Sequence, residues 1–294
     1  MNAGAVFPAA AALPAEPPLV VRRPQAAHER GLLFASPHSG RLYPAAMMEA
    51  SRLDGAAIRR SEDAFVDRLI EGGLDHGAIL ILATHARAFV DVNRAPYELD
   101  PAMFADALPD FAQSDTVRVA AGLGSIARIV AEGHEIYTRK LTFAEAEARI
   151  DAVHRPYHAA LAAEADRLIA RRGAVLLVDW HSMPAAAARP VGRDGCDVVL
   201  GDRFGASCAP MVTEAAEAIL IRLGYRVARN APYAGGYTTE IYGQPGEGRH
   251  ALQIELNRAL YMDEATVTPH AGFARLKSDL DQVFAALATV AGQL

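Results

Sequence analysis

Two continuous apolar runs constrain the fold of this chain more than any other feature of its sequence. Residues 78–84 read AILILAT and residues 174–179 read AVLLVD, without alternation between polar and apolar positions. A strand that is apolar at nearly every position is covered on both faces, as in the sheets of α/β proteins. Because helical patterns separate such runs, the sequence predicts a three-layer α/β/α fold around one central sheet.

Shorter runs and periodic segments fill in this architecture. We expect further strands at 32–35, 89–92, 196–200 and 252–256, with an edge strand at 225–227. Apolar residues spaced three or four apart predict helices over 63–74, 143–171, 211–223 and 274–287. Pro156 should kink or split the longest of these helices, because proline lacks the backbone N–H that a helix interior requires.

The composition bounds the functional class. Of the 294 residues 51% are hydrophobic, enough for a large core in a single domain over 26–294, while the Ala- and Pro-rich residues 1–25 predict a flexible tail. A net charge of −6 without any Lys/Arg cluster argues against a nucleic-acid partner, and no apolar run approaches the roughly 18 residues that span a membrane. Two cysteines, Cys196 and Cys208, favour a reducing cytoplasm. The sequence leaves a homo-oligomer open.

Histidines directly follow two of the predicted strands. His38 comes after the strand at 32–35 and His181 after 174–179. Sites in open α/β sheets form at the carboxyl ends of strands, and zinc prefers imidazole ligands. A carboxylate at a helix start, Glu62 or Asp63, can complete the three protein ligands of a catalytic site. The alternative is that the histidines are structural and the carboxylate only complements the helix dipole.

Glu255 is the candidate general base. It lies between apolar residues in a predicted core strand, where a buried ionised carboxylate needs a partner or a catalytic role. Beside a metal it can take a proton from water and deliver it to a leaving amine. The alternative is an ion pair with Arg258 or Arg249.

Two arginines suit recognition of an anionic substrate. Arg87 and Arg94 bracket a short predicted strand, with Asn93 just before the second. Guanidinium groups bind carboxylates through paired hydrogen bonds, and one near a metal can stabilise an oxyanion. The alternative for Arg94 is a structural ion pair with Asp91. Tyr237, in a glycine-containing loop, can close over a substrate or lie in a plain hairpin turn.

Eight segments together resemble the N-formylglutamate amidohydrolase family. They are SPHSG at 36–40, EDAFVDRL at 62–69, RAFVDVNR at 87–94, AGLGSIARI at 121–129, RPYHAAL at 155–161, DWHSMP at 179–184, GGYTTEIYG at 235–243 and LQIELNRALYMDE at 252–264. The resemblance rests on their order and number, since each segment is short. It implies a mixed sheet between helices, distantly similar to the zinc carboxypeptidases and aspartoacylases.

The resemblance also implies a metal centre. It assigns one zinc ion per chain to His38, Asp63 and His181. The chain departs from the carboxypeptidase pattern at Arg41, where that pattern has a glutamate ligand three residues after its first histidine. The middle ligand is therefore assigned to Asp63, from the family's acidic helix start.

The remaining site residues follow from the same resemblance. Glu255 falls at the position of the general base, Arg87 at that of an oxyanion-stabilising arginine, and Asn93 with Arg94 at those that bind a substrate carboxylate. The implied reaction is hydrolysis of an N-acyl amino acid such as N-formyl-L-glutamate, within histidine degradation. Two alternatives stay open. One is a zinc amidase or peptidase with a different N-acyl substrate, and the other is a non-catalytic protein that binds acidic amino acids.

Overall fold

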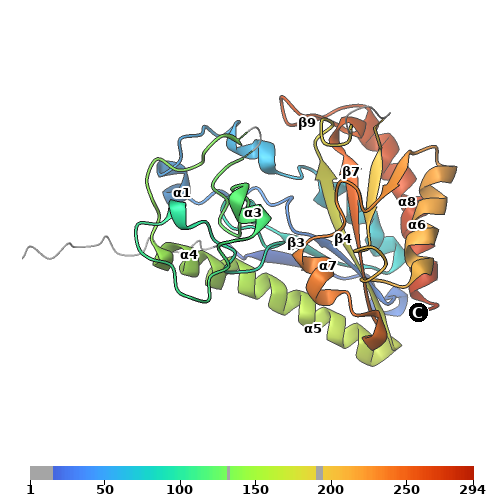
Figure 1. The fold of residues 1–294 in the computed structure, drawn as a ribbon. Coiled ribbons are helices and arrows are strands. Elements are labelled where there is room, and N and C mark those ends of the chain that lie inside the picture. The colour runs from blue at the N-terminus through green and yellow to red at the C-terminus, as the bar shows by residue number, and fades with distance from the viewer. Residues whose placement is uncertain (1–15, 131–132, 190–194) are drawn as a thin grey trace, which may run out of the picture.

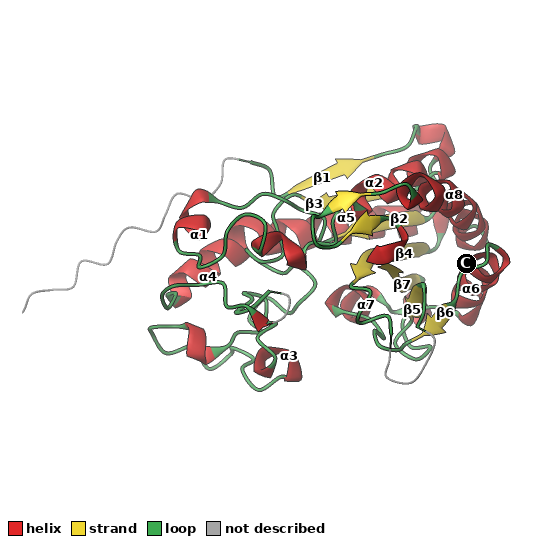
Figure 2. Ribbon diagram, turned by 90° about the horizontal axis from the view of Figure 1, so that it is seen from above, coloured by secondary structure: helices red, strands yellow, loops and turns green. Residues whose placement is uncertain are grey.

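The computed structural model describes residues 16–130, 133–189 and 195–294. Its centre is a seven-stranded sheet in the order β1-β3-β2-β4-β7-β5-β6 (Figures 1 and 2). β3, β2, β4 and β7 run parallel, whereas β1 and β5 pair antiparallel with β3 and β7, so the sheet is mixed. The strands are β1 (Leu19–Arg22), β2 (Leu32–Ser36), β3 (Ile79–Ala83), β4 (Val175–Met183), β5 (Val198–Gly201), β6 (Val227–Arg229) and β7 (Arg249–Asn257).

Helices cover both faces of this sheet. Helix α5 (Arg155–Arg172) lies on one face, and α6 (Pro210–Arg222) with α8 (Gly272–Ala291) lies on the other (Figure 1). The shorter α-helices are α1 (Ala45–Glu49), α2 (Val66–Leu69), α3 (Val117–Ala120), α4 (Phe143–Arg149) and α7 (Tyr237–Tyr242). Short 3-10 helices are η1 (Ala26–His28), η2 (Ile58–Ser61), η3 (Ile70–His76), η4 (Pro101–Met103), η7 (Pro245–Glu247) and η8 (Arg258–Leu260), and a small ribbon pairs β8 (Met262–Asp263) with β9 (Thr268–Pro269).

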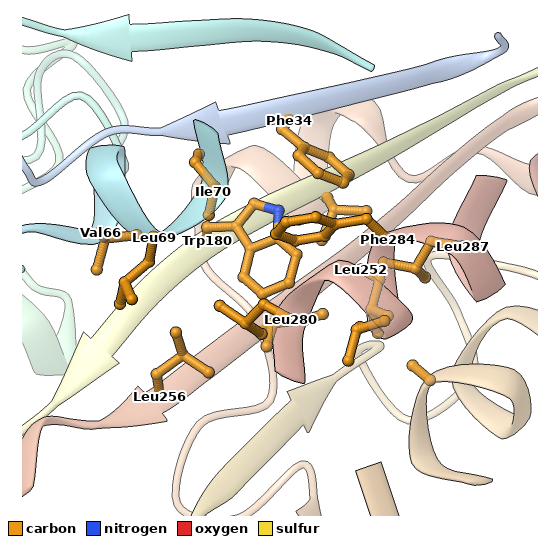
Figure 3. Packing of buried hydrophobic residues seen from close by; sticks show 14 of the residues in the cluster. Phe34, Val66, Leu69, Ile70, Trp180, Leu252, Leu256, Leu280, Phe284 and Leu287 are labelled. Atoms are coloured by element: carbon orange, nitrogen blue, oxygen red, sulfur yellow. The ribbon is translucent and has the colours of Figure 1, made fainter. Parts of the chain in front are cut away.

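The central strands are buried on both faces, which explains their unbroken apolar sequences. Phe34 of β2 faces the α8 layer, where its ring packs with Trp180 of β4 and Phe284 of α8 (Figure 3). The three ring centroids lie 5.2 to 5.6 Å apart. The neighbouring residue Leu33 faces the opposite layer, with Leu161 of α5. This double burial holds β2 and β4 rigidly and thereby fixes where their carboxyl ends meet.

A loop-rich lobe extends from one side of the sheet. It carries α1, α3 and α4, and both views place it away from α6 and α8 (Figures 1 and 2). The segment Phe89–Val92 belongs to the start of this lobe and is not a strand, so that prediction is wrong. Its apolar side chains join the core that β2, β3 and α5 share, but its backbone is in no sheet ladder. The backbone N–H of Phe89 donates instead to the carbonyl of Ala86 in a turn.

The N-terminal stretch also differs from the sequence expectation. Leu19–Arg22 lies within the residues predicted as a tail, yet it forms β1 on the edge of the sheet, paired with β3. Its burial alternates between half-buried and exposed positions, with Leu19 and Val21 against the core. Four residues are too short a run to signal a strand by periodicity. Residues 1–15 lie outside the described part of the chain.

The three-layer α/β/α prediction is confirmed. The helix predicted over 143–171 continues from α4 into α5 through a π turn, Ile150–His154, which ends two residues before Pro156. The Arg155 N–H donates to the Ile150 carbonyl, five residues back, so the widened turn accommodates the proline. Among the described residues, no helix combines the length and the apolarity needed to cross a membrane.

Candidate active site and metal centre

Three metal-ligand side chains meet at the carboxyl edge of the parallel strands. His38 follows β2, His181 lies near the end of the neighbouring β4, and Asp63 precedes α2. The Asp63 N–H donates to the His38 carbonyl at 3.0 Å, which fixes the two segments together. All three side chains are at most 3% exposed. The fold therefore brings together the residues that the sequence predicted.

The distances within this group fit a metal ion. His38 Nδ1 and His181 Nδ1 lie 3.0 Å apart, and Asp63 Oδ2 lies 3.3 and 3.1 Å from them. Tetrahedral zinc with bonds of about 2.0 Å separates its ligand atoms by about 3.3 Å. Because all three atoms carry lone pairs, they favour a cation between them. These residues can hold a metal ion.

Hydrogen bonds with neighbouring side chains orient the three candidate ligands. His38 Nε2 donates to Asp91 at 2.7 Å, and His181 Nε2 donates to Asp179 at 2.9 Å. With one proton held on Nε2, each Nδ1 faces Asp63. It donates a hydrogen bond there while it is protonated, and it offers a lone pair once it gives up that proton to bind a cation. Arg258 Nη2 donates to the other Asp63 oxygen at 2.9 Å. Such outer carboxylates fix the tautomer and raise the basicity of metal-binding histidines.

These contacts keep the buried carboxylates ionised. Burial alone would raise the pKa of Asp63, but hydrogen bonds from His181 and His38 and the charge of Arg258 outweigh it and hold the pKa well below its ordinary value. Burial likewise opposes ionisation of Asp91, and Arg87 and His38 hold its pKa well below normal. Ionised carboxylates are the form that binds a cation.

Glu255 lies beside the metal-type group. It pairs in register with His181 across β4 and β7, and both side chains line the same cavity. Gln253 Nε2 donates to Glu255 Oε1 at 2.9 Å. Burial raises the pKa of Glu255 to about 7, with the positive charge of His181 opposing and the negative charge of Asp63 adding. A carboxylate poised near neutral pH suits a general base.

The ion-pair alternatives for Glu255 are wrong. In the described part of the chain, Arg258 forms its salt bridge with Asp63, and Arg249 forms one with Asp166. The alternative for Arg94 is wrong as well, since it is Arg87 that pairs with Asp91, at 2.7 Å. Each of these arginines therefore has another partner than the one that its spacing in the sequence suggested.

A cavity of about 570 Å³ opens over these groups. The predicted residues that line it are His38, Asp63, Arg87, Asn93, Arg94, His181 and Glu255. Tyr237 does not belong to this lining. Its ring packs instead against His158 and His154, with centroids 5.3 and 6.0 Å away, because Tyr237 starts helix α7 rather than a hairpin turn. Tyr233, four residues earlier, lines the cavity from the same loop.

The Asn93 side chain, which lines the cavity, also forms hydrogen bonds with the protein. Its Nδ2 donates to Asp179 at 3.1 Å, and its Oδ1 accepts the Thr238 N–H at 2.8 Å. Gly236 packs against this amide so closely that a Cβ there would lie 2.5 Å from Nδ2. Asn93 therefore helps to hold Asp179, the carboxylate that accepts the proton of His181 Nε2.

Two histidines of the π turn and α5 hold the loop that carries Arg94. His154 Nε2 donates to the Arg94 carbonyl at 2.8 Å, and His158 Nε2 donates to the Val92 carbonyl at 2.7 Å. Burial lowers the pKa of both imidazoles, that of His158 to about 4, so both are neutral near pH 7. Their spacing of four residues on one helical face was the available signal in the sequence.

Sequence reasoning missed other residues of the site. Asp179 stands two residues before His181, and period-two alternation places both on one face of β4, so it was open to inference. Arg118 of α3 and Gln253 of β7 also line the cavity. Arg118 carries no such signal, since only the folding of the lobe brings it to the sheet.

The chain was compared with known families and structures. The sequence model described as N-formylglutamate amidohydrolase matches residues 30–262.

The chain belongs to this family.

Its relatives agree with the assignment. An N-formylglutamate deformylase of Pseudomonas aeruginosa is 32% identical over 237 residues, which cover 79% of this chain and 82% of that protein. The Pseudomonas putida deformylase is 28% identical over similar shares, 79% and 82%. The crystal structure of N-formylglutamate amidohydrolase from Ralstonia eutropha superposes with a TM-score of 0.88 and 36% identity, over 94% of this chain and 99% of that one. The chain is therefore an amidohydrolase.

Proposed function

We propose that this amidohydrolase hydrolyses N-formyl-L-glutamate to formate and L-glutamate with one zinc ion held by His38, Asp63 and His181. The proposal is carried by one observation. Three buried lone-pair atoms lie 3.0 to 3.3 Å apart in the cavity that Glu255 also lines. The names of the Pseudomonas and Ralstonia relatives supply the substrate.

The donor set suits zinc. Imidazole nitrogens and a carboxylate oxygen are its common protein ligands, and three of them leave one position open for chemistry. When bound, zinc would supply a Lewis acid that polarises the amide carbonyl and lowers the pKa of water. His38 and His181 would bind it through Nδ1 while their Nε2 protons stay on Asp91 and Asp179.

Glu255 moves the protons of the reaction. It takes one proton from the attacking water as the oxygen forms its bond to the formyl carbon. It then delivers that proton to the departing nitrogen as the C–N bond breaks, so the amine of glutamate leaves neutral. Burial beside Gln253 gives the carboxylate a fixed orientation for both transfers.

Arginines bind the negative charges. Arg87, held by Asp91, stabilises the oxyanion that develops on the amide oxygen. Arg94 anchors a substrate carboxylate, as its guanidinium lines the cavity and donates only to the carbonyls of Leu123 and Asn93 within the described chain. Asn93 acts as a positioning residue through Asp179, and Tyr237 acts indirectly, through its contact with His158.

A formate-release assay tests the proposal. N-formyl-, N-acetyl- and N-succinyl-L-glutamate are each supplied to purified, chelated and zinc-reloaded protein. We expect the N-formyl compound to react fastest, chelation to abolish turnover, and zinc to restore it. In His38→Ala we expect loss of both bound zinc and activity, whereas His28→Ala, an exposed matched control, keeps both. Full activity after chelation would contradict the role of zinc, and preference for another acyl group would contradict the substrate.

The setting of the reaction follows from the same proposal. The family resemblance implies histidine degradation as the pathway. Cys196 and Cys208 are buried free thiols, which suits the reducing cytoplasm. The partner is a small carboxylate-bearing substrate, and the lined cavity has the volume of a small-molecule site.

A further inference from the structure

More arginines than carboxylates line the described part of the cavity. Among the described residues that line it are five arginines and three carboxylates, namely Arg60, Arg87, Arg94, Arg118, Arg258, Asp63, Asp91 and Glu255. Arg87 and Arg258 form close salt bridges, at 2.7 and 2.9 Å. Within the described chain, Arg94 forms none. Arg118 has only a contact of 3.8 Å to Glu98.

The partner of Arg118 is largely taken by another group. Glu98 is buried, and its Oε1 accepts the hydroxyl proton of Thr116 at 2.6 Å. The same Thr116 caps the start of α3 by accepting the Val119 N–H at 3.1 Å. Thr116 and Glu98 thus fix the turn that presents Arg118, while the guanidinium stays beyond hydrogen-bonding distance of the carboxylate.

One backbone turn connects Arg118 to Arg94. The Leu123 N–H donates to the Arg118 carbonyl at 2.8 Å, and the Leu123 carbonyl accepts from Arg94 Nε at 3.1 Å. Burial lowers the pKa of Arg94, and the like charges of Arg87 and Arg118 add to that effect. Like charges that line one cavity repel each other, and a bound anion relieves that repulsion.

Apolar residues separate the charged groups of the cavity. Leu123, Ala127 and Ile129 line the same cavity as Arg118. Such a surface suits the methylene groups that join the two carboxylates of an acidic amino acid. The cavity therefore combines an apolar wall with a second cation.

We propose that Arg118 is a specificity-determining residue that binds a second carboxylate of the substrate, so that the site selects N-formyl derivatives of dicarboxylic amino acids. Arg94 retains the carboxylate already assigned to it, and Arg118 takes the other. This assignment rests on the proposed function. It adds to that function a residue from outside the segments that carry the family resemblance.

Steady-state kinetics with two isosteric substrates tests the assignment. N-formyl-L-glutamine differs from N-formyl-L-glutamate only by an amide in place of the side-chain carboxylate. A charge-assisted hydrogen bond of 1.5–3 kcal/mol corresponds to roughly 10- to 150-fold in affinity. In Arg118→Gln we expect kcat/KM for N-formylglutamate to fall by about that factor, mainly through KM, while kcat/KM for N-formylglutamine changes less than about threefold.

Two further variants separate binding from folding. Arg118→Lys keeps the charge and should restore part of the preference for glutamate. Arg139→Gln makes the same change at an exposed arginine that pairs with Glu145 outside this cavity, and should leave both substrates unaffected. An equal loss on both substrates in Arg118→Gln, or an unchanged ratio between them, would overturn the assignment.

A binding titration makes the result independent of turnover. Glutarate and its monoamide are titrated into zinc-loaded wild type and Arg118→Gln by calorimetry. We expect wild type to prefer glutarate and the variant to lose that preference. If wild type released no formate, the proposed function would fail, yet this titration would still decide the role of Arg118. An unchanged preference for glutarate in Arg118→Gln would refute that role.

Discussion

Two clusters around buried carboxylates lie at opposite ends of the parallel strands and are built in opposite ways. At the amino edge, before β2, Glu29 accepts hydrogen bonds from Arg167 at 2.7 and 3.0 Å and from Arg171 at 2.9 Å. At the carboxyl edge, His38, Asp63 and His181 bring lone pairs within 3.0 to 3.3 Å of one another. The arginines of the first region neutralise its carboxylate, whereas the side chains of the second can hold a cation.

The same helix serves both regions. The last turns of α5 carry Arg167 and Arg171, and its first turn carries His158, which holds the loop of Arg94. A charged cluster whose donors and acceptors match is explained by stability alone. A cluster of imidazoles and a carboxylate that converge on one point can also hold a cation. We therefore expect substitutions in the catalytic region to lower turnover, and substitutions around Glu29 to lower stability without lowering turnover.

The largest expected effect is on turnover. Glu255→Gln removes the proton acceptor but keeps the shape of the side chain, so we expect formate release to fall by about 10³-fold. Bound zinc should stay at one ion per chain, because Glu255 is not a ligand. Metal analysis and initial rates measure the two quantities. Turnover close to that of wild type would remove Glu255 from the mechanism.

The next largest effect is on the pH dependence of stability, through His158 of α5. The folded pKa of His158 lies at about 4, below the ordinary 6.5, so the unfolded chain binds more protons between these values. Stability should fall as the pH drops through this window, by up to roughly 3 kcal/mol from this group.

In His158→Gln we expect this part of the pH dependence to vanish, which urea unfolding at pH 7 and pH 5 measures. His28→Gln changes an exposed histidine in the same way and should keep the wild-type dependence. Parallel pH profiles for wild type and His158→Gln would show that burial does not hold this imidazole neutral.

A smaller effect is expected on metal affinity. Asp179→Asn keeps the size of the side chain but loses the charge that accepts the His181 Nε2 proton. Loss of such an outer carboxylate typically weakens metal binding 10- to 100-fold. Competition with a chromogenic chelator measures this change. Asp166→Asn, at an exposed carboxylate paired with Arg249, is the control and should bind zinc normally. If the two variants bound zinc with equal affinity, Asp179 would have no part in metal binding.

The smallest effect belongs to the amino edge. Glu29→Gln should lower the unfolding free energy by about 1–2 kcal/mol, since Arg167 and Arg171 are partly solvated, and leave formate release unchanged. The Arg167 hydrogen bond lowers the pKa of Glu29 below 4.5, so its stabilisation exists above that pH and disappears as the pH falls. The difference from wild type should therefore shrink in acid. Reduced turnover at full stability would break the contrast between the two edges.

The sequence predicted those parts of the site that depend on the sheet. The apolar runs of β2 and β4 locate the strand ends, and parallel pairing of the two strands then brings His38 to His181. Glu255 follows by the same logic, because β7 pairs with β4. The apolar pattern of each strand indicates where that strand ends, so these three side chains could be located without a prediction of the loops.

The parts that depend on the lobe were beyond such reasoning. The 89–92 run has the composition of a strand but is buried in a turn-rich segment. Arg118 reaches the cavity only because the lobe folds back, and Tyr237 points elsewhere because its loop becomes α7. The hydrogen bonds of the cavity-lining Asn93 amide to Asp179 and Thr238 were not foreseen either. Long-range contacts between irregular segments decide all four, and they leave no periodic trace.

Anomalous diffraction at the zinc edge, on crystals grown with stoichiometric zinc, tests the central claim most directly. We expect a single strong peak bonded to His38 Nδ1, Asp63 Oδ2 and His181 Nδ1, and none beside Glu29. No peak between these three side chains in active protein, or a zinc ion bound elsewhere in the cavity, would contradict it.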